Sequence, residues 1–76
     1  MNEKKLRVLV IDDEPQIQKL LRVSLQVQGY LFEGVLTGKD GVARAATLKP
    51  DIMIVDLGLP DMDGKEVVLQ VREWSQ

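Results

Sequence analysis

Short apolar runs alternate along the chain with segments of helical periodicity, and this alternation is the feature that most restricts the fold. The apolar runs, rich in Val, Ile and Leu, span residues 6–11, 31–36 and 51–55. The segments with helical spacing span residues 15–28, 38–49 and 64–75. Strands that alternate with helices pair in parallel, and right-handed crossovers carry each helix over a face of the sheet. We therefore expect an α/β fold with three parallel strands and three helices.

Local signals support the ends of these elements. Pro15 suits the first turn of a helix, because its missing N–H would have no partner there in any case. Gly29 is a typical residue just beyond a helix end. Thr37 is expected to cap the second helix, with Asp40 three residues later as in a shortened capping box. Pro50 requires that helix to end before it.

The third apolar run, Ile-Met-Ile-Val at residues 52–55, is uninterrupted. Strands of a parallel sheet that are buried on both faces have this composition, whereas half-exposed strands alternate apolar and polar residues. We therefore expect both faces of this strand to be covered.

Acidic residues stand at the ends of two of the three predicted strands. Asp12 and Asp13 follow the first strand, and Asp56 follows the third. The carboxyl ends of parallel strands lie along one edge of the sheet, where α/β folds bind their ligands. If the first and third strands are neighbours, these carboxylates converge. Clustered carboxylates repel one another unless they bind a cation or take up protons.

The composition restricts the kind of cation. The chain has no Cys and no His, which excludes disulfides and sites built on thiolates or imidazoles. A hard cation held by oxygens remains, and Mg²⁺ keeps open positions for phosphate oxygens when one or two carboxylates hold it. Beside such an ion an Asp carboxylate can attack phosphorus and form an acyl phosphate.

Other interpretations of the acids compete with this one. Asp13 or Glu14 could do no more than cap the helix that follows. A phosphatase with an aspartyl-phosphate intermediate is a further alternative, but such enzymes carry Asp-x-Asp at the nucleophile, and here Gly58 takes the place of the second acid. A glycine-rich dinucleotide turn is excluded, because acids occupy its position after the first strand.

Charge and hydropathy limit the partners and the location. The formal net charge is −2 and the isoelectric point is near 5.0, so electrostatics give no reason to expect direct nucleic-acid binding. No apolar run approaches the ~20 residues of a membrane helix, and the N-terminus lacks the apolar core of a signal peptide. A cytoplasmic protein is expected.

Two blocks of sequence carry a family resemblance. The first is Val-Leu-Val-Ile-Asp-Asp-Glu-Pro at residues 8–15, and the second is Pro-Asp-Ile-Met-Ile-Val-Asp-Leu-Gly-Leu-Pro-Asp-Met-Asp-Gly at residues 50–64. Together they resemble the receiver domain of bacterial two-component response regulators. The second block and the Val-Arg-Glu-Trp-Ser ending resemble in particular the regulators of the potassium-uptake operon, which carry a winged-helix DNA-binding domain.

The resemblance implies a flavodoxin-like fold with the strand order 2-1-3 and a role for each matching residue. Asp56 matches the phosphoryl-accepting aspartate, which a sensor histidine kinase phosphorylates. Asp12 and Asp13 match the acid pair that organises Mg²⁺, and Gly58 matches the position whose backbone carbonyl completes the metal site. Receiver domains accept a phosphoryl group and at most assist their own phosphorylation, so the resemblance does not imply a turnover enzyme.

Receiver domains continue with two further strands and helices, so residues 1–76 match the N-terminal portion of one. The resemblance then implies that the chain lacks a Ser or Thr and a Lys that contact the phosphoryl group, and that phosphorylation is impaired. It also implies an exposed edge at the third strand, through which two copies could form a homodimer or higher oligomer. The alternative function is accordingly a structural or assembly fragment with a vestigial acidic site.

Overall fold

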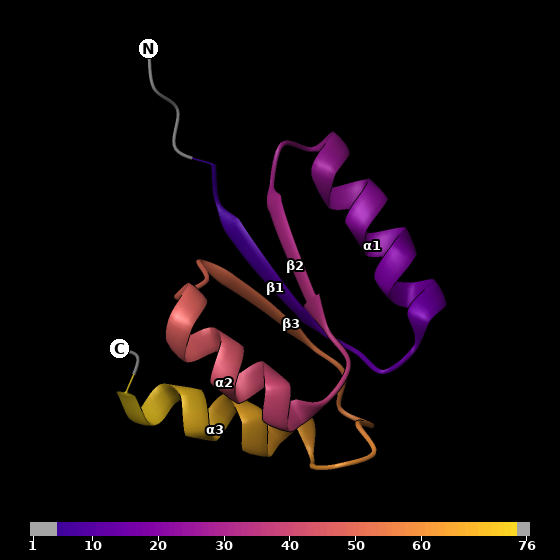
Figure 1. The fold of residues 1–76 in the computed structure, drawn as a ribbon. Helices are drawn as coiled ribbons and strands as arrows, with labels where there is room; N and C mark the ends of the chain where they lie inside the picture. Colours follow the sequence, from indigo (N-terminus) through magenta and orange to yellow (C-terminus); the bar gives the residue numbers. More distant parts are fainter. Residues whose placement is uncertain (1–4, 75–76) are drawn as a thin grey trace.

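The structure, a computed structural model, describes residues 5–74 (Figure 1). Three strands and three helices alternate, in the order β1 (Arg7–Ile11), α1 (Pro15–Val27), β2 (Leu31–Val35), α2 (Gly38–Leu48), β3 (Ile52–Val55) and α3 (Gly64–Trp74). Five of the six predicted ranges extend one residue too far at one end. Ser75, the last residue of the third predicted helix, lies outside the described residues.

Caps mark the ends of α1 and α2, and a side-chain hydrogen bond precedes β3. Lys49 ends α2 in the left-handed conformation, with φ of 53°. Gln28 is the C-cap of α1, and Gly29 beyond it has φ of 93°. Asp51 precedes β3, where its carboxylate accepts a hydrogen bond from the Arg7 amide at 2.8 Å. The expected cap of α2 is confirmed, because the Thr37 hydroxyl accepts the Asp40 amide at 3.1 Å.

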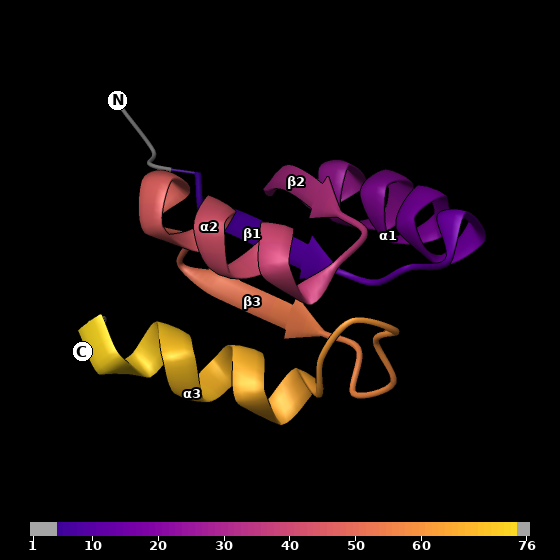
Figure 2. The same cartoon turned by 60° about the horizontal axis from the view of Figure 1, so that its bottom comes forward.

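The sheet has the order β2-β1-β3 with both pairings parallel, which confirms the flavodoxin-like arrangement expected from the sequence. Helix α1 lies on one face of the sheet, and α2 and α3 lie on the other (Figures 1 and 2). This division follows from right-handed crossovers, because the chain steps from β1 to β2 in one direction and from β2 back across β1 to β3 in the other. Strand β1 is therefore central.

The core lies between the sheet and helices α2 and α3. Four residues of β1, Val8 to Ile11, are at most 1% exposed. Leu9 and Ile11 belong to a buried cluster with residues of α2, of the loop after β3 and of α3, namely Ala45, Leu59, Val67 and Val71. Within residues 5–74, no helix is both long and apolar enough to cross a membrane.

The expectation that β3 is covered on both faces is wrong for the described residues. Met53 and Val55 pack against the core cluster, whereas Ile52 and Ile54, which alternate with them, are 38% and 37% exposed. Helix α1 covers this side of the sheet but makes its contacts with β2. Between residues 5 and 74 no element covers the same side of β3, so the apolar run has only one buried face.

Candidate functional site

The backbone brings the ends of β1 and β3 together. Ile11 and Val55 are the last residues in register, so Asp12 and Asp56 follow side by side. The Asp56 amide donates to the Ile11 carbonyl at 2.9 Å, and the Asp12 amide donates to the Val35 carbonyl at 3.1 Å. The sheet ladder therefore fixes the position of both aspartates at its carboxyl edge, next to the point where the strand order reverses.

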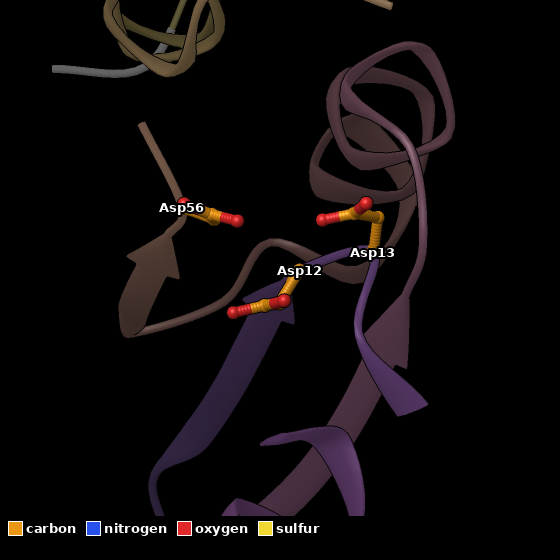
Figure 3. Close-up of side chains that lie close together, drawn as sticks. All are labelled: Asp12, Asp13 and Asp56. Carbon is orange, nitrogen blue, oxygen red and sulfur yellow. The ribbon is translucent and has the colours of Figure 1, made fainter. Parts of the chain in front are cut away.

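The three predicted acids meet at this edge. Figure 3 shows the side chains of Asp13 and Asp56 pointing toward each other, with that of Asp12 beside them. One carboxylate oxygen from each residue lies within 4.8 Å of the others. Asp12 and Asp56 are half-buried and Asp13 is exposed, so the cluster opens to solvent at one side.

Two of the carboxylates are oriented by short turns. One oxygen of Asp12, Oδ1, accepts the Glu14 amide at 2.9 Å, and Oδ1 of Asp56 accepts the Gly58 amide at 3.0 Å. Glu14 is the N-cap of α1, and no side chain caps that helix. The alternative in which Glu14 caps α1 with its side chain is therefore wrong.

The cluster also has no cationic side chain paired with it among residues 5–74. The salt bridge described there joins Arg44 of α2 to Glu33 of β2, with 3.0 Å between Nε and Oε2. A set of carboxylate oxygens without a protein cation suits a hard divalent ion. Oxygens bound to one Mg²⁺ lie up to about 4.2 Å apart, twice the ~2.1 Å bond length, which is close to the span of this cluster. The residues present therefore fit Mg²⁺.

Gly58 and Gly64 border the cluster from the connection between β3 and α3. Gly58 is exposed, and its amide is used by Asp56; its carbonyl as a metal ligand stays a prediction. Gly64 is buried at the start of α3. A Cβ placed there would lie 2.5 Å from the Asp56 carbonyl oxygen, so only a glycine lets α3 begin directly against Asp56.

Asp61 is a residue of this region that sequence reasoning missed. It lies in the loop after β3, and its two carboxylate oxygens accept the amides of Gly38 and Lys39, the first residues of α2, at 2.8 and 2.9 Å. These two hydrogen bonds hold the pKa of the Asp61 carboxyl below its usual value. No sequence signal identifies such a contact, because the partners are 22 and 23 residues apart.

Gln18 is the second residue that was missed. It lies on α1 and is only 7% exposed, and its side-chain amide donates to the Asp12 carbonyl at 3.0 Å. A signal was present in the sequence, because Gln18 precedes Leu21 and Leu25 by three and seven residues, which places a polar residue in an apolar helical stripe.

Known proteins resemble this chain in sequence. The profile of the family described as the response regulator receiver domain matches residues 8–76. The transcriptional regulatory protein KdpE of Mycobacterium tuberculosis is 51% identical over 67 residues, which are 88% of this chain and 30% of that protein. The KDP operon transcriptional regulatory protein KdpE of Escherichia coli is 44% identical over 68 residues, 90% of this chain and 30% of that protein. The chain thus spans about 30% of the length of these curated relatives.

Solved structures resemble it in fold. The response regulator TrrA of Thermotoga maritima, in complex with Mg²⁺ and BeF, has a TM-score of 0.88 at 33% identity, covering 95% of this chain and 62% of that one. TrrA in complex with the histidine kinase ThkA has a TM-score of 0.85 at 34% identity, covering 93% of this chain and 60% of that one. The resemblance expected from the sequence motifs is confirmed, and the chain belongs to the response regulator receiver domain family of two-component systems.

Proposed function

We propose that Asp56 accepts a phosphoryl group from a sensor histidine kinase in a reaction that depends on Mg²⁺. The observation that carries this proposal is the convergence of three carboxylates at the carboxyl ends of β1 and β3, within 4.8 Å of one another. The chain then acts as a phosphoryl acceptor in signalling and is not a turnover enzyme.

Each residue of the cluster has a distinct task in this proposal. Asp12, Asp13 and Asp56, with the Gly58 carbonyl, would hold the metal ion, and Mg²⁺ when bound offsets negative charge on the phosphoryl oxygens. Oδ1 of Asp56 is held by the Gly58 amide, so Oδ2 is the oxygen that we assign as nucleophile. Its bond to phosphorus forms as the bond from phosphorus to the kinase imidazole nitrogen breaks, and that nitrogen keeps the electron pair.

Similar proteins support a histidine kinase as the partner and Mg²⁺ as the ion. TrrA is a structural neighbour of this chain, and it has been crystallised with a histidine kinase and with Mg²⁺ and BeF. The KdpE relatives are transcriptional regulators. By the same likeness we propose that the chain works in the cytoplasm as part of a transcription regulator.

Intact mass tests the proposed acceptor. The chain is incubated with MgCl₂ and a small acyl phosphate, and one phosphoryl adduct is expected. Asp56→Asn should give none, because a neutral amide is a poor nucleophile. Asp40→Asn is the matched control: Asp40 is exposed on α2 and should leave the adduct intact. Removal of Mg²⁺ with a chelator should abolish it. An adduct that persists on Asp56→Asn would exclude Asp56 as the acceptor.

A second candidate function is assembly through the β3 edge, with the acidic cluster unused. The observation that favours it is the exposure of Ile52 and Ile54 on a strand that pairs only with β1 among residues 5–74. Unpaired backbone groups beside apolar side chains are a template for pairing with another chain. We propose a second copy of this chain as the occupant. Lack of any adduct on a folded, self-associated chain would favour this function over the first.

A further inference from the structure

Gln18 joins helix α1 to the carboxyl ends of two strands. Its Nε2 lies within hydrogen-bond distance of three carbonyl oxygens, those of Val10 at 3.2 Å, Asp12 at 3.0 Å and Val35 at 2.8 Å, which share its two N–H groups. The first two carbonyls belong to the end of β1, and the third belongs to the end of β2. One buried amide group therefore ties the ends of β1 and β2 to helix α1.

The same amide fixes the backbone on both sides of Asp12. The Asp12 N–H donates to the Val35 carbonyl, and that carbonyl also accepts Gln18. The Asp12 carbonyl accepts Gln18 as well. With both its N–H and its C=O held, Asp12 has little freedom of φ and ψ, and the directions in which the Asp12 and Asp13 side chains leave the backbone are fixed.

We infer that Gln18 is a positioning residue for the Mg²⁺ and phosphoryl site, an inference that rests on the proposed function of that site. Gln18 contributes no ligand atom. It orients the acid pair through the peptide groups of Asp12, as outer hydrogen-bond partners orient the direct ligands in metal sites. Because all three of its partners are acceptors, the position requires a donor, and an apolar or carboxylate side chain of equal length would offer none to these carbonyls.

The side chain of Gln18 packs closely against Gly34 of β2. The Gln18 Oε1 is buried without a hydrogen-bond partner among the described residues. A Cβ on Gly34 would lie 2.1 Å from that oxygen, so the absence of a side chain at Gly34 makes the space that Oε1 fills. Any side chain on Gly34 must displace Gln18, although it leaves the chemistry of Gln18 unchanged.

The test is Mg²⁺ affinity in the variant Gln18→Met, which keeps the length and removes the donor. MgCl₂ is titrated into the nitrogen-labelled chain, and the amide resonances of residues 12–14 and 56–58 are followed by NMR. We expect the dissociation constant to rise about tenfold or more, as when outer partners of metal ligands are lost. Gln26→Met is the matched control, because Gln26 lies exposed at the far end of the same helix and should bind as the parent does.

The Mg²⁺ affinity of Gln18→Met distinguishes a role of Gln18 in positioning the site from a general role in the stability of the fold. Titrations are made where circular dichroism shows each variant to be folded. A Gln18→Met chain that unfolds more easily but binds Mg²⁺ with the parent's affinity would overturn the inference and leave the proposed function standing. A parent chain without saturable Mg²⁺ binding would overturn the proposed function, and the inference with it.

Gly34→Ala keeps the inference testable if Gln18→Met does not fold. Ala is otherwise favourable at a strand position, since glycine weakens a strand. We expect Gly34→Ala to weaken Mg²⁺ binding severalfold, because the new Cβ displaces Oε1 and with it the amide that holds Asp12. An unchanged affinity in a folded Gly34→Ala chain would count against positioning by Gln18.

Discussion

Asp12 and Asp56 occupy corresponding places at the ends of neighbouring strands, and each is held in the same way. In both residues one carboxylate oxygen accepts the amide two positions further on, the arrangement of an Asx turn. Each turn uses one oxygen of the carboxylate and leaves the other oxygen without this backbone hydrogen bond. Asp13, between strand and helix, is the most exposed of the three acids.

A single residue, Asp61, is also expected to make the stability of the fold depend on pH. Backbone hydrogen bonds from Gly38 and Lys39 lower the pKa of Asp61 below the ordinary value of 3.8. A carboxyl whose pKa is lower in the folded state stabilises that state above the unfolded pKa, and the contribution is lost as pH falls through the folded pKa. The free energy of unfolding should therefore fall as pH drops below about 4.

Asp61→Asn should remove this part of the pH dependence, because the amide does not ionise. Urea unfolding of the parent and the variant at neutral pH and near pH 3 measures the difference. Asp40→Asn, which removes the same charge from the first turn of α2, is the control for the loss of one negative charge. If the free energy of unfolding changed with pH equally in the parent and in Asp61→Asn, the assignment of this pH dependence to Asp61 would be wrong.

At the scale of elements, the contact between α2 and β1 depends on a missing side chain. Gly41 of α2 is buried, and a Cβ there would lie 2.3 Å from the Ile11 Cδ1. Ile11 is itself fully buried and directly precedes Asp12. The glycine therefore sets how closely α2 approaches the central strand.

Gly41→Ala should destabilise the fold by about 1–3 kcal/mol through overpacking. Helix propensity alone predicts the opposite sign, since Ala is favoured over Gly in a helix interior by about 1 kcal/mol. Ala46→Gly, on the exposed side of α2, is the control and should cost about 1 kcal/mol from propensity alone. Urea unfolding measures both, and a Gly41→Ala variant more stable than the parent would show that Ile11 can move aside.

The elements themselves could be predicted from sequence because their signals are local. Apolar runs, helical spacing and caps such as Thr37 depend on residues within a few positions of one another. The meeting of Asp12 and Asp56 followed from a topological rule about parallel strands. The contacts of Gln18 and Asp61, and the open face of Ile54, depend on which distant segments come together. Periodicity carries no information about such partners.

On the scale of the whole molecule, β3 lies at the edge of the sheet formed by residues 5–74 and has an apolar face. We expect two copies to associate with β3 paired against β3 about a two-fold axis, which makes that junction antiparallel in an otherwise parallel sheet. Sedimentation velocity at micromolar concentration should show a dimer or larger species. A monodisperse monomer with cooperative unfolding would rule out this mode of assembly.

Ile54→Lys should shift the equilibrium toward the monomer, because a charged side chain on an edge strand opposes pairing. Leu20→Lys is the control. Leu20 is 62% exposed and lies on α1, which covers β2, so this substitution adds the same charge away from the β3 edge. If Ile54→Lys and Leu20→Lys dissociated the dimer equally, the added charge would act in general, and the copies would not be in contact through β3.

The three acids at the open edge of the sheet also affect diffusion toward it. Their field extends about 8–10 Å into solution at moderate ionic strength before salt screens it. Within that distance the field concentrates cations and repels anions, which raises the encounter rate of the first and lowers that of the second. A phosphoryl donor is itself an anion, so it reaches an empty cluster more slowly than a cluster that has already captured a divalent ion. Under the proposed function, Asp12, Asp13 and Asp56 would thereby favour a temporal order of arrival, with the metal ion first and the phosphoryl donor second.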